Sequence, residues 1–298
     1  MALLSSLRQF GGLVRLSHTI FGLPFTFAAA ALAHAAATEG KLVAATEGLT
    51  GAKMLWIILA FTGARTAAMG FNRIVDRKID AKNPRTAERE LPAGKITLAA
   101  VSVFTGLSVL VFLGSTWALG GVALALSPLC LLVIFAYSLF KRFSWASHLI
   151  LGIALAMGPA GAWVAVTGNL HSFATPTILM IAVASWVAGF DILYSLQDEQ
   201  FDRSVGLHSI PVTFGTRGAV LLSAALHVVT AGALLCVHVA EDLGAWHLGG
   251  VALVSTILVY EHWIVGPGRL NRINRAFFDL NGYVSIAYLV CVLLDVFV

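Results

Sequence analysis

The sequence predicts an all-α membrane protein with nine transmembrane helices around a central cavity. Three observations lead to this class. Charged residues make up only 11% of the chain and the mean hydropathy is +0.87, whereas soluble domains carry roughly 25% charged residues. Apolar runs of roughly 20 residues, the length that crosses a bilayer, recur along the whole chain. Lys and Arg gather in alternate loops, the pattern that orients membrane proteins.

The predicted spans follow the apolar runs in chain order. They cover residues 17–37, 54–75, 97–114, 117–139, 146–166, 175–195, 218–239, 245–265 and 277–297. The first run follows basic residues and ends in ALAHAAA, so cleavage as a signal peptide is the alternative for this span and would leave eight. We expect residues 1–298 to form a single integral-membrane domain.

The distribution of positive charge predicts the orientation. Sixteen of the nineteen Lys and Arg residues fall at the N-terminus or in the loops that follow even-numbered spans. Only Lys41 and Lys53 fall on the opposite side, and Arg65 lies inside a span. Because cytoplasmic loops carry the excess of Lys and Arg, the N-terminus is expected in the cytoplasm and the C-terminus outside.

Two cytoplasmic loops are longer than the others, at about 76–96 and 196–217, and both open with aspartates. They follow the second and sixth spans, which are four spans apart. This spacing predicts two four-helix pseudo-repeats plus one added helix. Polar residues at matching positions of two repeats indicate a shared central site.

The first acidic segment is FNRIVDRKID, residues 71–80. At 100° per residue, Asn72, Asp76 and Asp80 are spaced i, i+4 and i+8 and lie along one helix face. Arg65, two turns earlier, falls on nearly the same line. Stacked carboxylates repel one another, so the segment is expected to face a compensating positive charge.

The second acidic segment extends the sixth span. Asp191, Tyr194, Asp198 and Asp202 are spaced i, i+3, i+7 and i+11, which predicts one shared helix face. Two such carboxylate pairs facing each other suit Mg²⁺, which takes oxygen ligands and is bound through one or two carboxylates plus substrate phosphates. The pattern therefore indicates a site for Mg²⁺ and a diphosphate.

Two simpler interpretations apply to either acidic segment alone. A DxxxD at a helix end is commonly a solvated terminus paired with local Arg and Lys, and acidic groups at the cytoplasmic mouth could line an ion or proton path. Two such segments on the same side, each flanked by basic residues and ending equivalent helices, favour the shared diphosphate site.

The motifs resemble those of the UbiA family of intramembrane aromatic prenyltransferases. The resemblance rests on N-x3-D-R-K-x-D followed by NPRTAERELPAGK, and on D-x2-Y-x2-QD-x3-D-x3-G-x-HSIP in the second segment. It extends over nearly the whole chain, through RLSHTIFGLPFTF, YSLFKRF and NRAFFDLNG. Among family branches, the chain is most similar to bacterial quinone-pathway members of the 4-hydroxybenzoate polyprenyltransferase type.

The resemblance implies a function. The family transfers a polyprenyl group from polyprenyl diphosphate to an aromatic acid with Mg²⁺, here 4-hydroxybenzoate or a dihydroxynaphthoate, for ubiquinone or menaquinone synthesis. It also implies the bacterial inner membrane, with lipid and these substrates as partners and no nucleic acid. The expected metal ligands are Asn72, Asp76, Asp80, Asp198 and Asp202.

Four basic residues are candidates for phosphate binding. Arg77 and Lys78 lie between the first two aspartates, and Lys141 and Arg142 lie in the next cytoplasmic loop. Arg suits bidentate phosphate recognition. For the pair at 141–142, simple anchoring by the positive-inside rule is the alternative.

Three further residues are candidates for acceptor chemistry. Asp191 lies deep in a span, where an ionisable group is costly and commonly functional. It could orient or deprotonate the acceptor phenol, assisted by Tyr194, and the alternative is an internal hydrogen bond between helices. Arg65 could bind an acceptor carboxylate or pair with Asp191. His18 is expected at the lipid interface.

Two rival classes use similar residues. A transporter of an anionic substrate predicts helices broken by Gly or Pro near the bilayer midplane, whereas the acidic clusters here lie at the cytoplasmic mouth. A CDP-alcohol phosphotransferase carries one compact Asp/Gly/Arg signature on a single helix, whereas this chain divides its acids between two helices.

Overall fold

The computed structural model describes residues 19–38, 48–171, 173–265, 273 and 276–298. In this part of the chain, one long helix corresponds to each predicted span, so the all-α prediction is confirmed. The helices are α2 (Thr19–Thr38), α3 (Gly51–Asp80), α4 (Leu98–Leu119), α5 (Gly121–Phe140), α6 (Ser147–Thr167), α7 (Ala174–Ser195), α9 (Ile210–Ala240), α10 (Ala245–Ile264) and α12 (Asn281–Phe297).

Eight of the described helices are long and apolar enough to cross a membrane, and the protein is a polytopic membrane protein. The helix outside this set is α10, which carries His247, Glu261 and His262 and is therefore less apolar. It packs against α9 and α12 along its length.

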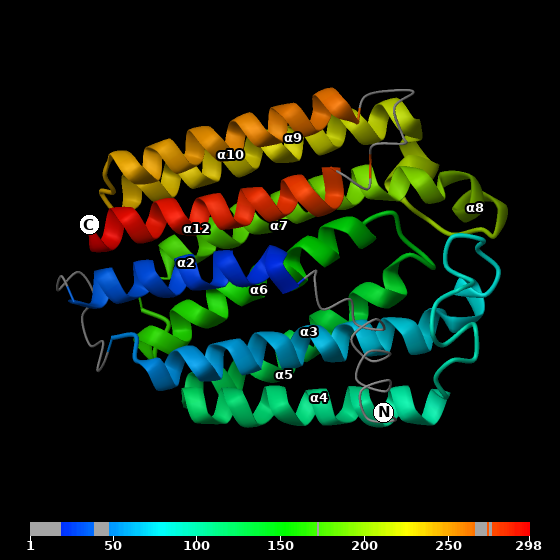
Figure 1. The fold of residues 1–298 in the computed structure, drawn as a ribbon, viewed down its shortest axis with the longest axis horizontal. Coiled ribbons are helices and arrows are strands. Elements are labelled where there is room, and N and C mark those ends of the chain that lie inside the picture. The colour runs from blue at the N-terminus through cyan, green and yellow to red at the C-terminus, as the bar shows by residue number, and fades with distance from the viewer. Residues whose placement is uncertain (1–18, 39–47, 172, 266–272, 274–275) are drawn as a thin grey trace.

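The helices form a bundle with three parts (Figure 1). On one side, α3 packs against α4 and α5, and on the opposite side α10 packs against α9 and α12. Between them, α6 contacts both α2 and α7. The core is built from large side chains that lipid does not reach, among them Phe25, Trp163, Trp186 and Tyr288. The Phe25 ring stacks on Tyr288 with the ring centroids 4.8 Å apart.

The helix that carries the first acidic segment is regular and longer than predicted. Thr50 caps its N-terminus by accepting a hydrogen bond from the Lys53 amide at 3.2 Å. The helix then continues without a break to Asp80, so the whole segment 71–80 is helical. The face predicted from its spacing is therefore built on a rigid element.

The second acidic segment departs from the prediction. α7 ends at Ser195, a 3₁₀ turn follows at Leu196–Asp198, and a separate short helix, α8, runs over Glu199–Ser204. A 3₁₀ turn has three residues per turn instead of 3.6, so the angular register changes there. The prediction of one regular helix from Asp191 to Asp202 is therefore wrong.

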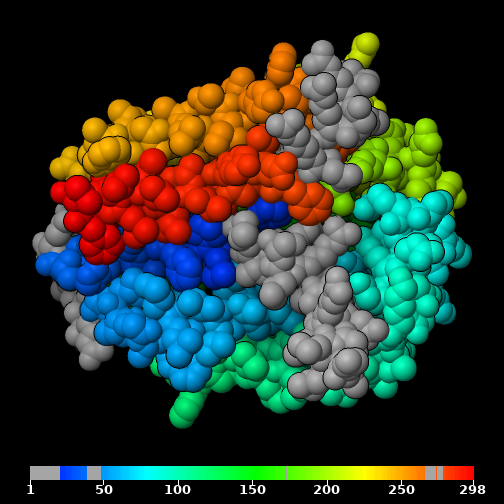
Figure 2. Space-filling model, in the orientation of Figure 1, coloured from blue at the N-terminus to red at the C-terminus, as the bar shows by residue number. Residues whose placement is uncertain are grey.

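The two acidic segments lie at the same end of the bundle. In Figure 1 the loop after α3, residues 81–97, lies beside α8 at the right-hand end. The space-filling view shows the same loop covering this end next to the residues around α8 (Figure 2). His18, which was expected at the lipid interface, lies outside the described residues.

Candidate active site

The first acidic segment is held by hydrogen bonds within α3 and from the loop that follows. Asn72 Nδ2 donates to Asp76 Oδ2 at 2.8 Å, as the i, i+4 spacing requires. Asp80 is buried, and its two oxygens each accept from Arg89 Nη1 at 2.8 Å. Arg73 lies about two helical turns before Asp80 and approaches it to 3.9 Å. Each carboxylate thus faces a polar or positive partner.

The loop after α3 reaches the second acidic segment. Asn83 Nδ2 donates to Asp198 Oδ1 at 3.0 Å, and Arg85 binds the same carboxylate through Nε and Nη2. Arg85 Nη1 also donates to the Tyr194 hydroxyl at 3.2 Å. The loop that follows the first acidic segment therefore holds the Asp198 carboxylate of the second segment, through Asn83 and Arg85.

The charge state of Arg85 follows from this contact. Burial alone lowers the pKa of Arg85, but the hydrogen bond and the negative charge of Asp198 outweigh that effect. The pKa of this guanidinium consequently lies above its usual value. Arg85 is a fixed positive charge at the junction of the two segments.

Two consecutive residues of the loop between α5 and α6 complete the connection. Lys141 Nζ lies 2.9 Å from Asp202 Oδ1, and Arg142 Nη2 lies 2.7 Å from Asp76 Oδ1. Arg142 also donates to the Ser138 carbonyl at 2.8 Å, which holds its guanidinium in place. One dipeptide thus bridges carboxylates of both acidic segments.

These contacts define a polar layer, by which we mean the acidic residues of both segments and the side chains paired with them. Its acidic members come from α3, the 3₁₀ turn and α8, and its basic members come from two loops. It consists of Asn72, Asp76, Asp80, Asn83, Arg85, Arg89, Lys141, Arg142, Asp198 and Asp202.

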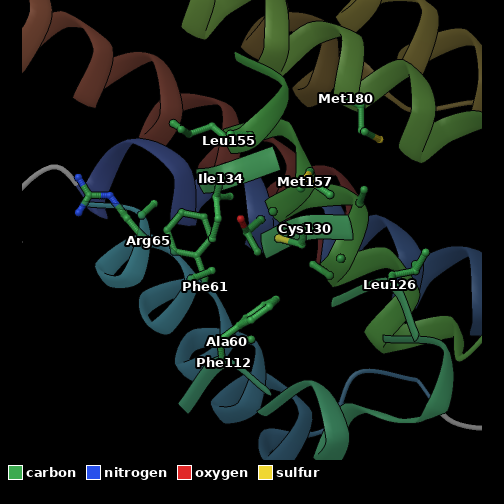
Figure 3. A pocket seen from close by; sticks show the side chains of 18 of the residues that line it. Ala60, Phe61, Arg65, Phe112, Leu126, Cys130, Ile134, Leu155, Met157 and Met180 are labelled. Atoms are coloured by element: carbon green, nitrogen blue, oxygen red, sulfur yellow. The ribbon is translucent and has the colours of Figure 1, made fainter. Parts of the chain in front are cut away.

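A cavity of about 590 Å³ lies in the bundle (Figure 3). Apolar side chains of α2 to α7 form most of its wall, including Phe61, Phe112, Leu126, Ile134 and Met180. Arg65 and Asp191 also line it, together with Tyr137. Each of these three residues precedes a member of the polar layer by one or two helical turns: Arg65 comes seven residues before Asn72, Tyr137 four before Lys141, and Asp191 seven before Asp198. This part of the wall, which we call the charged wall, therefore lies close to the polar layer.

Asp191 has a specific partner. His148 Nδ1 lies 2.7 Å from Asp191 Oδ2, and the His148 side chain is only 5% exposed. His148 is the second residue of α6. The sequence motifs included Asp191 but gave no role to His148.

The structure places the remaining predicted residues as follows. Arg65 and Asp191 share the cavity, as expected for a joint role. Tyr194 is directed to Arg85 instead of the acceptor region. The Arg77 guanidinium donates to the carbonyl of Ile74 in its own helix at 2.8 Å, and Lys78 is exposed. The phosphate-binding role of these residues stays a prediction.

Four residues of the site were missed by motif reasoning. Asn83, Arg85 and Arg89 all fall within NPRTAERELPAGK, the segment that carries part of the family resemblance. Three polar residues in one short loop, directly after an acidic helix, are the signal that could have identified them. His148 gave no comparable signal, because its partner lies 43 residues away.

The acidic residues suit a hard divalent cation. They offer carboxylate and amide oxygens, and Oδ2 of the buried Asp202 has no partner among the described residues, while its Oδ1 lies against Lys141. No three acidic, His or Cys side chains of the described residues converge as a ready metal site. Mg²⁺ is typically bound through one or two carboxylates plus substrate phosphates. The residues therefore fit a metal that the substrate helps to hold.

In this helical membrane bundle, a charged layer lies next to a largely apolar cavity. Such a site suits a membrane enzyme whose substrate has an ionic head and a hydrocarbon tail. The model of the UbiA prenyltransferase family matches residues 22–283, and the chain belongs to this family. It is a prenyltransferase.

Relatives of known name agree with the family. A 4-hydroxybenzoate octaprenyltransferase of Pseudomonas fluorescens is 30% identical over 253 residues, which cover 82% of this chain and 81% of the relative. The enzyme of the same name from Vibrio campbellii is 27% identical over 259 residues, covering 86% of this chain and 89% of the relative.

Solved structures share the fold. A UbiA homolog from Aeropyrum pernix, solved in the apo state, superposes with a TM-score of 0.82 at 32% identity, covering 93% of this chain and 98% of that one. A homolog from Archaeoglobus fulgidus, bound to DMAPP and Mg²⁺, gives a TM-score of 0.65 at 17% identity, covering 93% and 99%. At that identity the likeness supports the fold alone.

Proposed function

We propose that the enzyme transfers a polyprenyl group from polyprenyl diphosphate to a ring carbon of 4-hydroxybenzoate, for quinone biosynthesis. The observation that carries the proposal is the adjacency of the polar layer to an apolar cavity whose charged wall contains Arg65 and Asp191. The name of the relatives, 4-hydroxybenzoate octaprenyltransferase, supports both the acceptor and a polyprenyl donor.

The donor head would bind in the polar layer. Three cations of the polar layer are paired with carboxylates in this structure: Arg85, Lys141 and Arg142. The same groups can contact phosphate oxygens once the diphosphate binds. Arg77 and Lys78 would join them from the surface of α3. Bound Mg²⁺, held by Asn72, Asp76, Asp80, Asp198 and Asp202, would supply Lewis-acid stabilisation of the departing diphosphate.

The acceptor would bind at the charged wall of the cavity. Arg65 pairs with the acceptor carboxylate, and Asp191 accepts the phenolic proton, which makes the ring more nucleophilic. Tyr194 acts on the donor side instead, because its hydroxyl accepts a hydrogen bond from Arg85 of the polar layer.

The reaction balances with these groups. The allylic C–O bond breaks and its electron pair leaves with the diphosphate, while a ring carbon next to the phenol forms a C–C bond to the prenyl carbon. The ring carbon then loses its proton and the oxygen regains one, which restores the phenol. Each turnover releases one diphosphate and one proton.

The apolar wall has a chemical task in this scheme. An allylic cation reacts with water, so a site lined by hydrocarbon protects it until the ring attacks. The prenyl tail is itself hydrocarbon and gains free energy by leaving water for this wall. Aromatic rings such as Phe61 offer a negative face to a nearby cation.

The orientation and extent of the enzyme are part of the proposal. We infer that residues 1–298 form one domain in a bacterial inner membrane, with both acidic segments cytoplasmic and the C-terminus outside. The placement of sixteen of nineteen Lys and Arg residues on one side supports this orientation. Labelling of single cysteines introduced at Glu88 and Asp242, with an impermeant reagent on whole cells, tests it: only position 242 should react.

The activity is tested with the purified protein in detergent. It is incubated with Mg²⁺, with geranyl or longer diphosphates, and with a panel of hydroxybenzoates and dihydroxynaphthoates, and products are identified by mass spectrometry. We expect a C-prenylated 4-hydroxybenzoate, loss of product with EDTA and recovery with Mg²⁺. Prenylation of a dihydroxynaphthoate alone would replace the acceptor, and indifference to EDTA would contradict the metal role.

Variants locate the site in the same assay. Asp76→Ala and Asp198→Ala should each abolish turnover while the protein still inserts into membranes. Glu88→Ala is the matched control, because this carboxylate lies in the same loop with a side chain that is 91% exposed. Normal activity of both aspartate variants would remove the proposed metal ligands.

A further inference from the structure

We propose that His148 is a positioning residue for the acceptor half of the reaction, because it fixes the proton-accepting carboxylate of Asp191. This inference rests on the proposed function and assigns a role to a side chain outside the acidic motifs. His148 and Asp191 would thus act on the aromatic acceptor, whereas the polar layer acts on the prenyl diphosphate.

The geometry determines which nitrogen of His148 carries the proton. Nδ1 lies 2.7 Å from Asp191 Oδ2, and because a carboxylate oxygen accepts, Nδ1 carries the proton and donates it. In a neutral imidazole the other nitrogen, Nε2, is then an acceptor. Nε2 faces the backbone N–H of Ile210 at 3.5 Å, a weak contact that agrees with this tautomer.

This hydrogen bond has a consequence for Asp191. The terminal torsion of an aspartate side chain is broad and only weakly confined on its own. With Oδ2 held by a buried imidazole, the carboxylate plane is fixed, and the second oxygen remains to accept a proton from a ligand in the cavity that Asp191 lines. Because the Asp191 carboxylate is already oriented, it does not have to lose conformational freedom when the acceptor binds.

The position of His148 suits this task. It enters from the start of α6, while Asp191 comes from α7 and Ile210 begins α9. Three helices therefore converge on one buried imidazole. A purely structural role would predict that losing His148 harms the whole site, so the test must separate the two halves of the reaction.

The donor half can be measured by itself. Without acceptor, ionisation of geranyl diphosphate in the presence of Mg²⁺ ends in attack by water and releases geraniol. Prenylation of 4-hydroxybenzoate reports both halves. For His148→Phe, which keeps a ring but removes the donor, we expect kcat for prenylation to fall about 10–100-fold, as for loss of a group that orients a ligating or reacting side chain. Geraniol release should stay within about twofold.

Two further variants sharpen the result. His148→Asn keeps an N–H donor and should recover part of the prenylation rate. In a double-mutant cycle, His148→Phe combined with Asp191→Asn should be no slower than Asp191→Asn alone, because both changes remove one unit. Equal loss of geraniol release and prenylation in His148→Phe, or additive effects in the cycle, would overturn the proposal. Absence of prenylation by the unmodified enzyme would instead contradict the proposed function.

Discussion

Lys141 and Arg142 are adjacent in the chain, yet their side chains pair with carboxylates of different acidic segments. Lys141 lies 2.9 Å from Asp202 beyond α7, and Arg142 lies 2.7 Å from Asp76 on α3. Successive residues of a turn point in different directions, which allows one short loop to join both segments. The positive charge that the stacked carboxylates of each segment were expected to face is thus supplied, in part, by this one loop.

Removing Lys141 should destabilise the protein. Asp202 is fully buried, and Lys141→Ala would leave its carboxylate without the paired cation. Breaking a buried pair costs about 3–5 kcal/mol, and we expect about 2–3 kcal/mol here because the Lys141 side chain is 35% exposed. The measurement is the midpoint of thermal unfolding in detergent.

The control for this prediction is Lys95→Ala. Lys95 and Glu88 form an exposed pair at 3.9 Å, and such pairs contribute about 0–1 kcal/mol. A midpoint that moves equally in both variants would show that the burial of Asp202 has no energetic effect.

Arg85 and Tyr194 should differ sharply in importance. Arg85→Lys loses the two-nitrogen contact with Asp198, so kcat/KM for the prenyl diphosphate should fall about 10–100-fold. Tyr194→Phe removes only the hydroxyl that accepts from Arg85, and we expect a loss of a few-fold at most. If Tyr194→Phe instead raised KM for the aromatic acceptor, Tyr194 would act directly on the acceptor.

Phe61 should influence the choice of prenyl chain. Its ring lies in the cavity (Figure 3), and a Cβ built on Gly22 or Gly158 would come within 2.5 or 2.8 Å of neighbouring side-chain atoms, with Phe61 among them in both cases. The ring therefore reaches from α3 to α2 and α6. Phe61→Ala should widen the cavity between α3, α2 and α6. We expect the ratio of kcat/KM for long over short prenyl diphosphates to rise about tenfold. Competition between geranyl and octaprenyl diphosphates measures the ratio.

Phe61→Leu is the matched control, because it retains most of the side-chain volume. Its ratio should lie close to that of the unmodified enzyme. An unchanged ratio in Phe61→Ala would mean that the prenyl tail follows another route.

Gly152 should be required for the packing of α6 on α7. A Cβ at this position would lie 2.2 Å from the backbone oxygen of Ala184, so Gly152→Ala must push the two helices apart. Overpacking of this kind costs about 1–3 kcal/mol. Gly161→Ala in the same helix meets nothing within 4 Å and should leave the unfolding midpoint nearly unchanged. Equal midpoints for the two variants would contradict the close approach.

The sequence by itself determined the protein class and the position of the spans. Hydropathy acts locally, because every backbone group in a bilayer must be satisfied within its own segment, and each apolar run therefore predicted its helix. The spacing of Asn72 and Asp76 also placed both on one helix face, and on the regular part of α3 they form a hydrogen bond. The acidic residues themselves were visible as costly charges at the ends of apolar segments.

Only the tertiary structure decided which partner each acidic residue has. Arg85 meets Asp198 across 113 residues, and His148 meets Asp191 across 43. The break after Ser195, which separates Asp191 from Asp198 and Asp202, lies beyond the last regular turn of α7. Periodicity holds only while a helix remains regular, and contacts between distant segments depend on how the helices pack. The sequence therefore identified the charges, whereas the packing of the bundle assigned their partners.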